Sequence, residues 1–313
     1  MKNKKCTKVL SFITRQVITM SQWGFIGTIF LSMTMLVACT ETTADDQIEI
    51  KDNVSAKDTL PWQIIVGADT VHYTIQLVYK LDGKAKDYTQ NDITKIVFTF
   101  PQVDSFSQTN VKDSINTIVQ NSLLQNVIGE LSYENVEGRM VEFIAEYKEH
   151  KNEMLEFQLP STNWVFEMDI TILLNRPSLL SLRVNQLEFT GGAHANSWTN
   201  YLTIDLETGK VLQLKELFVE NFEQQLLTIS EAAFKRTVNL DLDTNLIETH
   251  YEFSSGEFML PPHFSVGSEG LHFYYNPYDL GPFALGAISF EIPYREILSI
   301  IDTNVLLLEP MEG

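Results

Sequence analysis

The sequence predicts an α+β fold: an antiparallel sheet meander with two helices in the N-terminal half and one long helix in the C-terminal half. Several stretches alternate apolar and polar residues with period two, which is typical of half-buried strands. Three other stretches repeat apolar residues at helical spacing. The run from Trp164 to Leu214 has short connections without crossover helices. That run favours antiparallel pairing over a doubly wound parallel sheet.

The first half of the chain contains two predicted strands followed by two predicted helices. In the clearest strand, Val71 and Ile75 lie on one face and His72 and Gln76 on the other. The second strand is expected to stop at Pro101, because proline lacks the N–H that a ladder needs. The four predicted elements are strands Val71–Lys80 and Ile93–Phe100 and helices Val111–Ile128 and Val136–His150.

The second half begins with a strand pair and a hairpin, which the remaining elements follow. The hairpin connection, residues 191–196, is rich in small residues, and Gly209 marks the next turn. The predicted strands are Trp164–Leu174, Leu179–Phe189, Trp198–Leu206, His263–Val266, Leu271–Asn276, Ala287–Ile292 and a last one at 306–308. The predicted helices are Asn221–Val238 and the short Tyr294–Ile300.

The N-terminus has the features of a secretory signal. Five basic residues precede an apolar segment, Trp23–Ala38, which ends in Leu-Val-Ala-Cys at Cys39. This ending resembles a bacterial lipobox, in which the cysteine receives a diacylglyceryl thioether and cleavage occurs just before it. We therefore expect a signal peptide at residues 1–38, a lipid on Cys39 and an acidic, flexible tether at residues 39–60. The alternative is a retained membrane span, but Ser21 and Gln22 interrupt the apolar run.

Charge sets the expected character of the exported part. Five of the 22 basic residues and none of the 41 acidic residues precede Cys39, so the remainder has a formal charge of −24. Such a body repels nucleic acid and anionic lipid and attracts cationic partners, although the same charge also serves solubility. With Cys6 removed and Cys39 lipidated, no cysteine is left for a disulfide.

Two stretches are candidate binding loops. In the first, Gly191 and Gly192 let the backbone approach a ligand, and His194 and Asn196 offer polar groups. The alternative interpretation is a hairpin that needs positive φ, with His194 bonded to local backbone. The second stretch is aromatic and stiffened by Pro277, which suits sugar stacking or a protein interface unless it packs into the core. Its candidate residues are Tyr274, Tyr275 and Tyr278.

Metal and catalytic signals are weak. A partial calcium loop has Leu246 where the motif needs glycine, so a solvated acidic loop is the preferred interpretation and no cofactor is expected. Its residues are Asp241, Asp243, Asn245 and Glu252. The sequence has no zinc-binding histidine spacing, no GxSxG elbow, no P-loop and no Rossmann fingerprint. We therefore expect no catalytic residues and no enzyme activity.

Two groups of motifs resemble a known pair of exported domains. The first is Phe189–His194 followed by Ile204–Lys210, and the second is Leu271–Gly286 closing with Ile292–Tyr294. Together they are similar to the domains of unknown function 4163 and 3298. These occur in bacterial lipoproteins, in lysozyme-sensing anti-sigma factors and ahead of the catalytic domain of some peptidoglycan deacetylases. The resemblance implies a 4163-like domain at 61–198 and a 3298-like domain at 199–313, packed as one unit.

This resemblance implies a cell-envelope role without catalysis. We expect a lipid-anchored binding protein, in the outer membrane if the cell is Gram-negative, whose partner is a cationic lysozyme-like hydrolase or a cell-wall glycan. Two alternatives remain open. One is an enzyme that modifies wall glycan through an unrecognised site, and a deep pocket joining His194 to carboxylates would favour it. The other is a purely structural lipoprotein, which a smooth acidic surface would favour.

Overall fold

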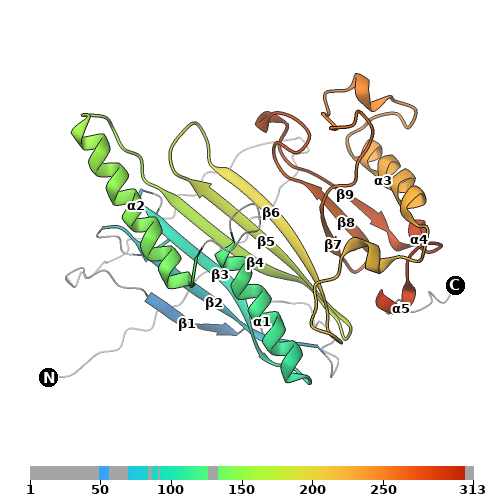
Figure 1. Cartoon of the computed structure of the whole chain (residues 1–313), viewed down its shortest axis with the longest axis horizontal. Coiled ribbons are helices and arrows are strands. Elements are labelled where there is room, and N and C mark those ends of the chain that lie inside the picture. The colour runs from blue at the N-terminus through green and yellow to red at the C-terminus, as the bar shows by residue number, and fades with distance from the viewer. Residues whose placement is uncertain (1–48, 56–69, 84–86, 91, 126–132, 307–313) are drawn as a thin grey trace, which may run out of the picture. The chain divides into compact units, whose positions relative to one another are not determined.

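Two β-sheets form the framework of the computed structural model, which describes residues 49–55, 70–83, 87–90, 92–125 and 133–306 (Figure 1). The larger sheet has the order β1-β2-β3-β4-β5-β6, and all neighbouring pairs are antiparallel except β3–β4. Its strands are β1 (Glu49–Ser55), β2 (His72–Leu81), β3 (Lys95–Ser105), β4 (Val165–Asn175), β5 (Leu179–Phe189) and β6 (Asn196–Asp205). The smaller sheet is β7 (His263–Val266), β8 (Gly270–Tyr275) and β9 (Ile288–Pro293), fully antiparallel.

The helices explain why one strand pair is parallel. Helices α1 and α2 form the crossover between β3 and β4 and lie over one face of the larger sheet (Figure 1). Helix α1 is Thr109–Leu124 and helix α2 is Val136–Glu156. The other helices are α3 (Glu223–Thr237), α4 (Tyr294–Ile297) and α5 (Thr303–Leu306). The 3-10 turns are η2 (Leu214–Leu217), η3 (Leu246–Glu248) and η4 (Phe283–Leu285). The predicted α+β class is confirmed, with two helices in the first half and one long helix in the second.

Two hydrophobic cores result from this arrangement. The first lies between the larger sheet and helices α1 and α2, where Phe98, Ile115 and Leu182 are fully buried. The second surrounds α3 and the smaller sheet and centres on Phe234 and Phe273. Strand β5 contributes to both, because its successive side chains point to opposite faces of the sheet: Leu180 belongs to the first core and Leu179 to the second.

Asparagine side chains bond backbone groups where a neighbouring strand is missing. Asn116 of α1 accepts a hydrogen bond from the Val103 N–H (2.8 Å) and donates one to the Val103 carbonyl (3.0 Å). Asn276 does the same for Thr199, at 2.6 and 3.0 Å. A primary amide matches the donor and acceptor of one residue, so each side chain satisfies both backbone groups. The Asn276 pair ties the chain beyond β8 to the outer edge of β6.

Most predicted elements are confirmed, and β3 is the clearest exception. It continues through Pro101, which lies opposite Ile75 of β2. Pairing with β4 covers only Lys95–Thr99. Beyond Thr99 the strand needs no ladder N–H on that side, so proline is tolerated. Helix α2 extends to Glu156, past the predicted end at His150, and Leu306, placed in a final strand by the sequence, ends α5.

Two expectations about segment boundaries also differ from the structure. Part of the expected tether, Glu49–Ser55, is β1 and pairs with β2. That strand is specified by the backbone edge of β2 rather than by its own acidic sequence, so the local pattern gave no sign of it. The expected domain boundary at 198/199 lies inside β6, which pairs with β5 over Asn196–Asp205. A position inside a paired strand offers no linker at which to divide the chain.

Several expectations concern residues outside the described ranges. These are the signal peptide at 1–38, the lipid on Cys39, the predicted end of α1 at Ile128 and the final strand beyond Leu306. Within the described ranges, none of the helices combines the length and the apolar character that crossing a bilayer requires.

Candidate functional site

The two candidate binding loops of the sequence meet in space. The imidazole of His194, in the β5–β6 hairpin, stacks on the ring of Phe283 with centroids 3.6 Å apart and planes 8° from parallel. Its Nε2 lies 3.4 Å from the hydroxyl of Tyr278. Residues separated by more than eighty positions in the chain therefore form one cluster at the end of the hairpin.

The hairpin glycines hold this histidine in place. Gly191 and Gly192 have φ of 111° and 101°, a region that side-chain-bearing residues rarely adopt. A Cβ on Gly192 would meet no atom within 4 Å, so the backbone conformation alone requires the glycine. The His194 Nδ1 is 3.1 Å from the Ala195 carbonyl, which is the local backbone bond that the sequence left open.

Tyr278 is held in an unfavourable backbone conformation. The Asp279 N–H donates to the Asn276 carbonyl (3.1 Å), which closes a turn with Pro277 and Tyr278 at its centre. Tyr278 has φ of 75°, where a type II turn normally has glycine. An aromatic residue there costs on the order of 1 kcal/mol, and such strain concentrates at functional sites. The side chain is nevertheless 59% exposed, so core packing does not repay the strain.

A cavity of about 280 Å³ lies beside this cluster. Its walls combine aromatic rings with amide, hydroxyl and carboxylate groups, and the lining residues are Gln186, Glu188, Asn196, Ser197, Trp198, Pro277, Tyr278 and Phe283. The buried Gln186 amide donates to the Glu188 carboxylate at 3.3 Å. Register places Gln186 opposite Trp198 and Glu188 opposite Asn196, so these four share one face of the β5–β6 pair.

The other two tyrosines lie elsewhere. Tyr275 is buried in the second core, where its hydroxyl donates to the Met259 carbonyl and burial raises the pKa of the phenol. Tyr274, its neighbour on β8, points to the opposite face and packs against Tyr201, with centroids 5.8 Å apart. The alternation of strand side chains therefore separates Tyr274 and Tyr275 from Tyr278. Phe283, which belongs to the same aromatic stretch, lines the cavity together with Trp198, which the sequence analysis did not select.

Two half-buried histidines lie where the sheets meet. Burial lowers the pKa of His263, whose Nδ1–H donates to Asn200 at 3.0 Å and whose ring meets Trp198 edge-on. Burial also lowers the pKa of His272, although Glu291 opposes that shift, and its Nε2 is 3.2 Å from the Tyr201 hydroxyl. These imidazoles are therefore neutral at physiological pH and serve as polar packing between strands.

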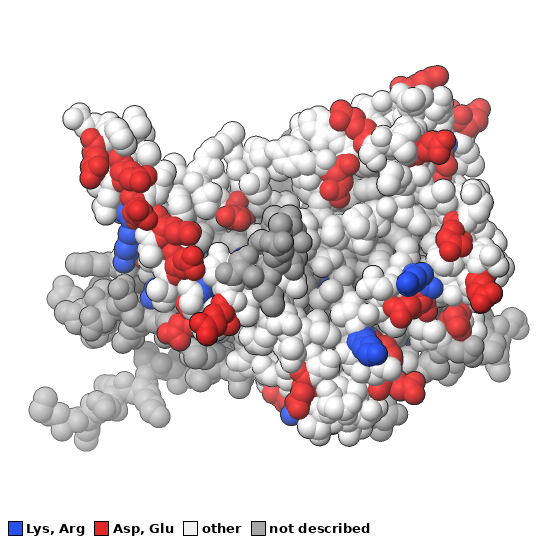
Figure 2. Space-filling view, in the orientation of Figure 1, with Lys and Arg blue, Asp and Glu red and all other residues white. Residues whose placement is uncertain are grey.

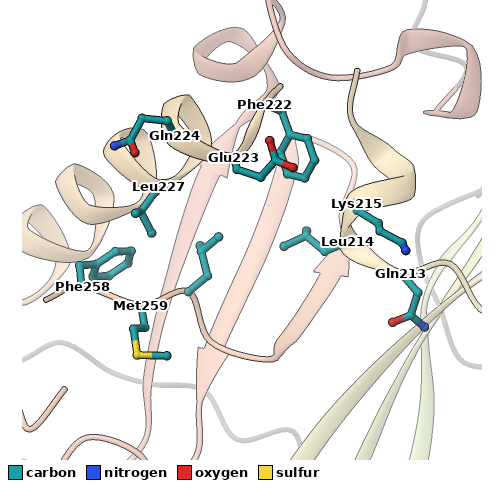
Figure 3. A pocket seen from close by; sticks show the side chains of 10 residues that line it. Gln213, Leu214, Lys215, Phe222, Glu223, Gln224, Leu227, Phe258 and Met259 are labelled. Atoms are coloured by element: carbon teal, nitrogen blue, oxygen red, sulfur yellow. The ribbon is translucent and has the colours of Figure 1, made fainter. Parts of the chain in front are cut away.

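A larger cavity of about 740 Å³ lies between α3 and the segment that precedes β7 (Figure 3). Its walls are mainly apolar and include Leu214, Phe222, Leu227, Phe258 and Met259. Lys215 and Glu223 place opposite charges on its lining (Figure 3). Sequence analysis gave no indication of it, because its residues come from three separate segments that each look like ordinary core.

Residues of the partial calcium motif take part in hydrogen bonds within the protein. Asn245 accepts a hydrogen bond from the Ile247 N–H (3.2 Å) and begins η3, while the Glu252 N–H bonds the Leu280 carbonyl. Among the described residues, no three His, Cys, Asp or Glu side chains are grouped closely enough to hold a metal ion.

Most of the charged side chains on the described surface are acidic in the view of Figure 2. Helix α2 alone carries six glutamates, at 137, 142, 146, 149, 153 and 156. Burial, and then the charges of Glu142, Glu149 and Glu188, raise the pKa of Glu146. Glu188 of the cavity lining is therefore close enough to Glu146 of α2 for the two charges to repel each other.

Comparisons with known proteins find two family matches, which cover separate parts of the chain. Residues 88–197 match a family model described as deacetylase PdaC, and residues 215–295 match the family of unknown function DUF3298. The expected resemblance to DUF3298 is thus confirmed over residues 215–295, while the N-terminal match is to a model with a description other than 4163. Among curated proteins no significant match was found.

Two solved structures share the fold. A DUF3298 family member from Bacteroides fragilis is 20% identical, with a TM-score of 0.61 over 76% of this chain and 96% of that one. A DUF3298 family protein from Pseudomonas aeruginosa is 16% identical, with a TM-score of 0.56 over 76% of this chain and 98% of that one. At these identities the likeness concerns architecture alone.

Proposed function

We propose that the protein is a lipid-anchored binding module of the bacterial cell envelope that holds wall glycan in the cavity beside His194. Its two family matches, to a deacetylase PdaC model and to DUF3298, support an envelope-associated role. The single observation that carries the choice of ligand is the lining of the cavity, where Trp198, Tyr278 and Phe283 adjoin side-chain amides and a carboxylate.

Sugars present two kinds of surface, and the cavity matches both. The apolar C–H face of a pyranose stacks on aromatic rings, and its hydroxyl groups need hydrogen-bond partners such as Gln186 and Asn196. A volume of about 280 Å³ suits a small unit such as one sugar ring rather than a drug-sized ligand. Aromatic stacking and hydrogen bonds from amides hold a sugar ring without reacting with it, and on that basis we propose that the site binds glycan.

Replacing Tyr278 with asparagine tests this proposal. Asparagine tolerates positive φ but removes the aromatic ring. We expect the free energy of unfolding to change by less than about 1 kcal/mol and the affinity for soluble wall-glycan fragments to fall about tenfold or more. Denaturant unfolding and titration calorimetry measure the two quantities. Tyr274→Asn is the matched control, because it removes a tyrosine outside the cavity; equal affinity loss in both variants would contradict the proposal.

A cationic hydrolase of the lysozyme type is the second candidate partner, and the acidic surface favours it. Long-range attraction raises association rates and weakens as salt screens it. We expect lysozyme to bind in low salt and the association rate to fall at least about tenfold near 0.5 M salt. Surface plasmon resonance measures this, with a neutral protein of similar size as the control. Absence of binding at every salt concentration would eliminate this partner.

Anchoring at Cys39 is part of the same proposal. A thioether lipid needs the cysteine sulfur, so Cys39→Ser is expected to abolish lipid labelling and to release the protein from membranes. Fractionation and labelling with a radioactive fatty acid provide the measurement, and Cys6→Ser is the control. An unaltered protein that stays in membranes uncleaved and without lipid labelling would support a membrane span instead.

The absence of catalysis is also testable. A glycan-modifying enzyme at this site would use His194, whose two ring nitrogens face the Ala195 carbonyl and the Tyr278 hydroxyl. Acetate release from an N-acetylated glycan, lost in His194→Ala, would contradict the binding proposal in favour of an enzyme. A purely structural lipoprotein would neither bind nor convert the glycan.

A further inference from the structure

We propose that Glu188 makes the cavity selective for glycan units that carry a free ammonium group, that is, hexosamine residues without the N-acetyl substituent. This inference rests on the proposed glycan-binding function and specifies the sugar. It follows from three features of the cavity: the charge of its lining, the placement of that charge beside aromatic rings, and the field of the neighbouring helix.

The lining contains one carboxylate and no cationic side chain. Glu188 supplies the charge, and the lining includes no Lys, Arg or His. The Gln186 amide donates to Glu188 Oε2, which orients the carboxylate without neutralising it. A carboxylate held in this way prefers a charged donor over a neutral one, because the attraction between the two opposite charges adds to the hydrogen bond itself. A sugar ammonium supplies that donor, whereas an acetamide offers a neutral N–H.

Aromatic rings strengthen the same preference. The cavity places Trp198, Tyr278 and Phe283 around the space next to Glu188. The negative faces of such rings attract a cation as well as the C–H face of a sugar. A glucosamine ring combines both features in one unit. The acetyl group of an N-acetylated unit would add volume and remove the charge.

The surroundings add negative potential. The charges of Glu142 and Glu188 both repel the carboxylate of Glu146 on α2. This repulsion helps to raise the pKa of Glu146, although burial contributes more. Arg139 is a cation that interacts with Glu188, whose charge raises the pKa of the guanidinium against the larger lowering by burial. Its buried guanidinium already donates to the Leu123 and Gln125 carbonyls and lies over the Phe166 ring, 4.3 Å from its centroid. The cavity therefore keeps a negative potential that a cationic ligand would neutralise.

A matched pair of ligands tests this inference. The full chain in detergent micelles is titrated by calorimetry, at about pH 6 where amines and carboxylates are both charged, with two β-1,4-linked tetramers: glucosamine and N-acetylglucosamine. We expect the amine tetramer to bind about tenfold more tightly in low salt, and this preference to shrink as salt increases. Glu188→Gln should weaken the amine tetramer about tenfold and leave the acetylated one unchanged. Glu207→Gln, which removes one charge outside the lining, is the control.

The outcomes separate this inference from the function on which it rests. Equal or tighter binding of the acetylated tetramer would overturn the ammonium preference while leaving glycan binding intact. Failure of both tetramers to bind would overturn the glycan proposal itself. If Glu188→Gln weakened both ligands equally, the carboxylate would have only a structural role and the inference would fall. The comparison of the two ligands on the unaltered protein remains decisive even if the variant folds poorly.

Discussion

Replacing Arg139 with alanine is expected to lower the free energy of unfolding by about 4 kcal/mol. This arginine is 4% exposed and joins the two helices of the first core. From α2 its guanidinium donates to the carbonyls of Leu123 and Gln125, at the C-terminal end of α1. It also packs over the rings of Phe98, Tyr133 and Phe166. Alanine would leave terminal helix carbonyls without a donor and open a cavity in an aromatic cage.

Urea unfolding followed by circular dichroism measures this loss. Arg236→Ala is the control, because Arg236 is also paired, with Glu296 at 3.0 Å, but lies on the surface. Exposed ion pairs contribute little, so we expect its cost to stay below about 1 kcal/mol. Arg139→Lys should fall between the two, since a lysine keeps the charge but lacks the planar fork. Similar stability of Arg139→Ala and Arg236→Ala would show that the buried guanidinium does not join the helices.

Asn276→Ala is expected to cost about 3 kcal/mol and to abolish ligand binding. Its amide satisfies both the N–H and the carbonyl of Thr199, a buried residue on the outer edge of β6. The same residue begins the turn that carries Tyr278. Removing the amide leaves two buried backbone groups unpaired and releases one wall of the cavity from the other.

Asn276→Asp distinguishes the contribution of the Thr199 N–H from that of the Thr199 carbonyl. A carboxylate still accepts from the Thr199 N–H but faces the Thr199 carbonyl without a donor, so we expect an intermediate loss of stability. Asn116→Ala, which removes the same kind of pairing to Val103 in the first core, is the matched control. It should destabilise the protein comparably while the folded fraction keeps its glycan affinity. Loss of affinity in both variants would mean that Asn276 acts only through global stability.

The sequence predicted most elements because each has a strong local pattern. Strands β5 and β7 begin and end at the predicted residues, and α2 begins at Val136 as expected. These segments bury one face, so their periodicity follows directly from packing. The errors occur where pairing with a strand distant in the sequence determines the secondary structure. Pro101 remains in a strand because β4 has already diverged, and Glu49–Ser55 becomes a strand by pairing with the edge of β2.

The candidate site could be predicted only in part, for the same reason. Unusual composition marked the two loops, and His194 and Tyr278 do meet. Their register with Gln186 and Glu188 depends on the pairing of β5 with β6, which no local pattern specifies. Tyr274 and Tyr275 were grouped with Tyr278 by proximity in sequence, but strand alternation and the turn at Pro277 direct the three side chains to different places.

The most direct test of the account follows the indole N–H resonances of the tryptophans during titration with soluble wall glycan. Trp198 lines the cavity, whereas the indole nitrogen of Trp164 is buried beneath α2 against Phe143 and Tyr147. Trp198→Phe assigns the signal. We predict that the Trp198 resonance shifts in a saturable way and that the Trp164 resonance does not. A saturating glycan that leaves Trp198 unmoved would contradict the claim that this cavity is the binding site.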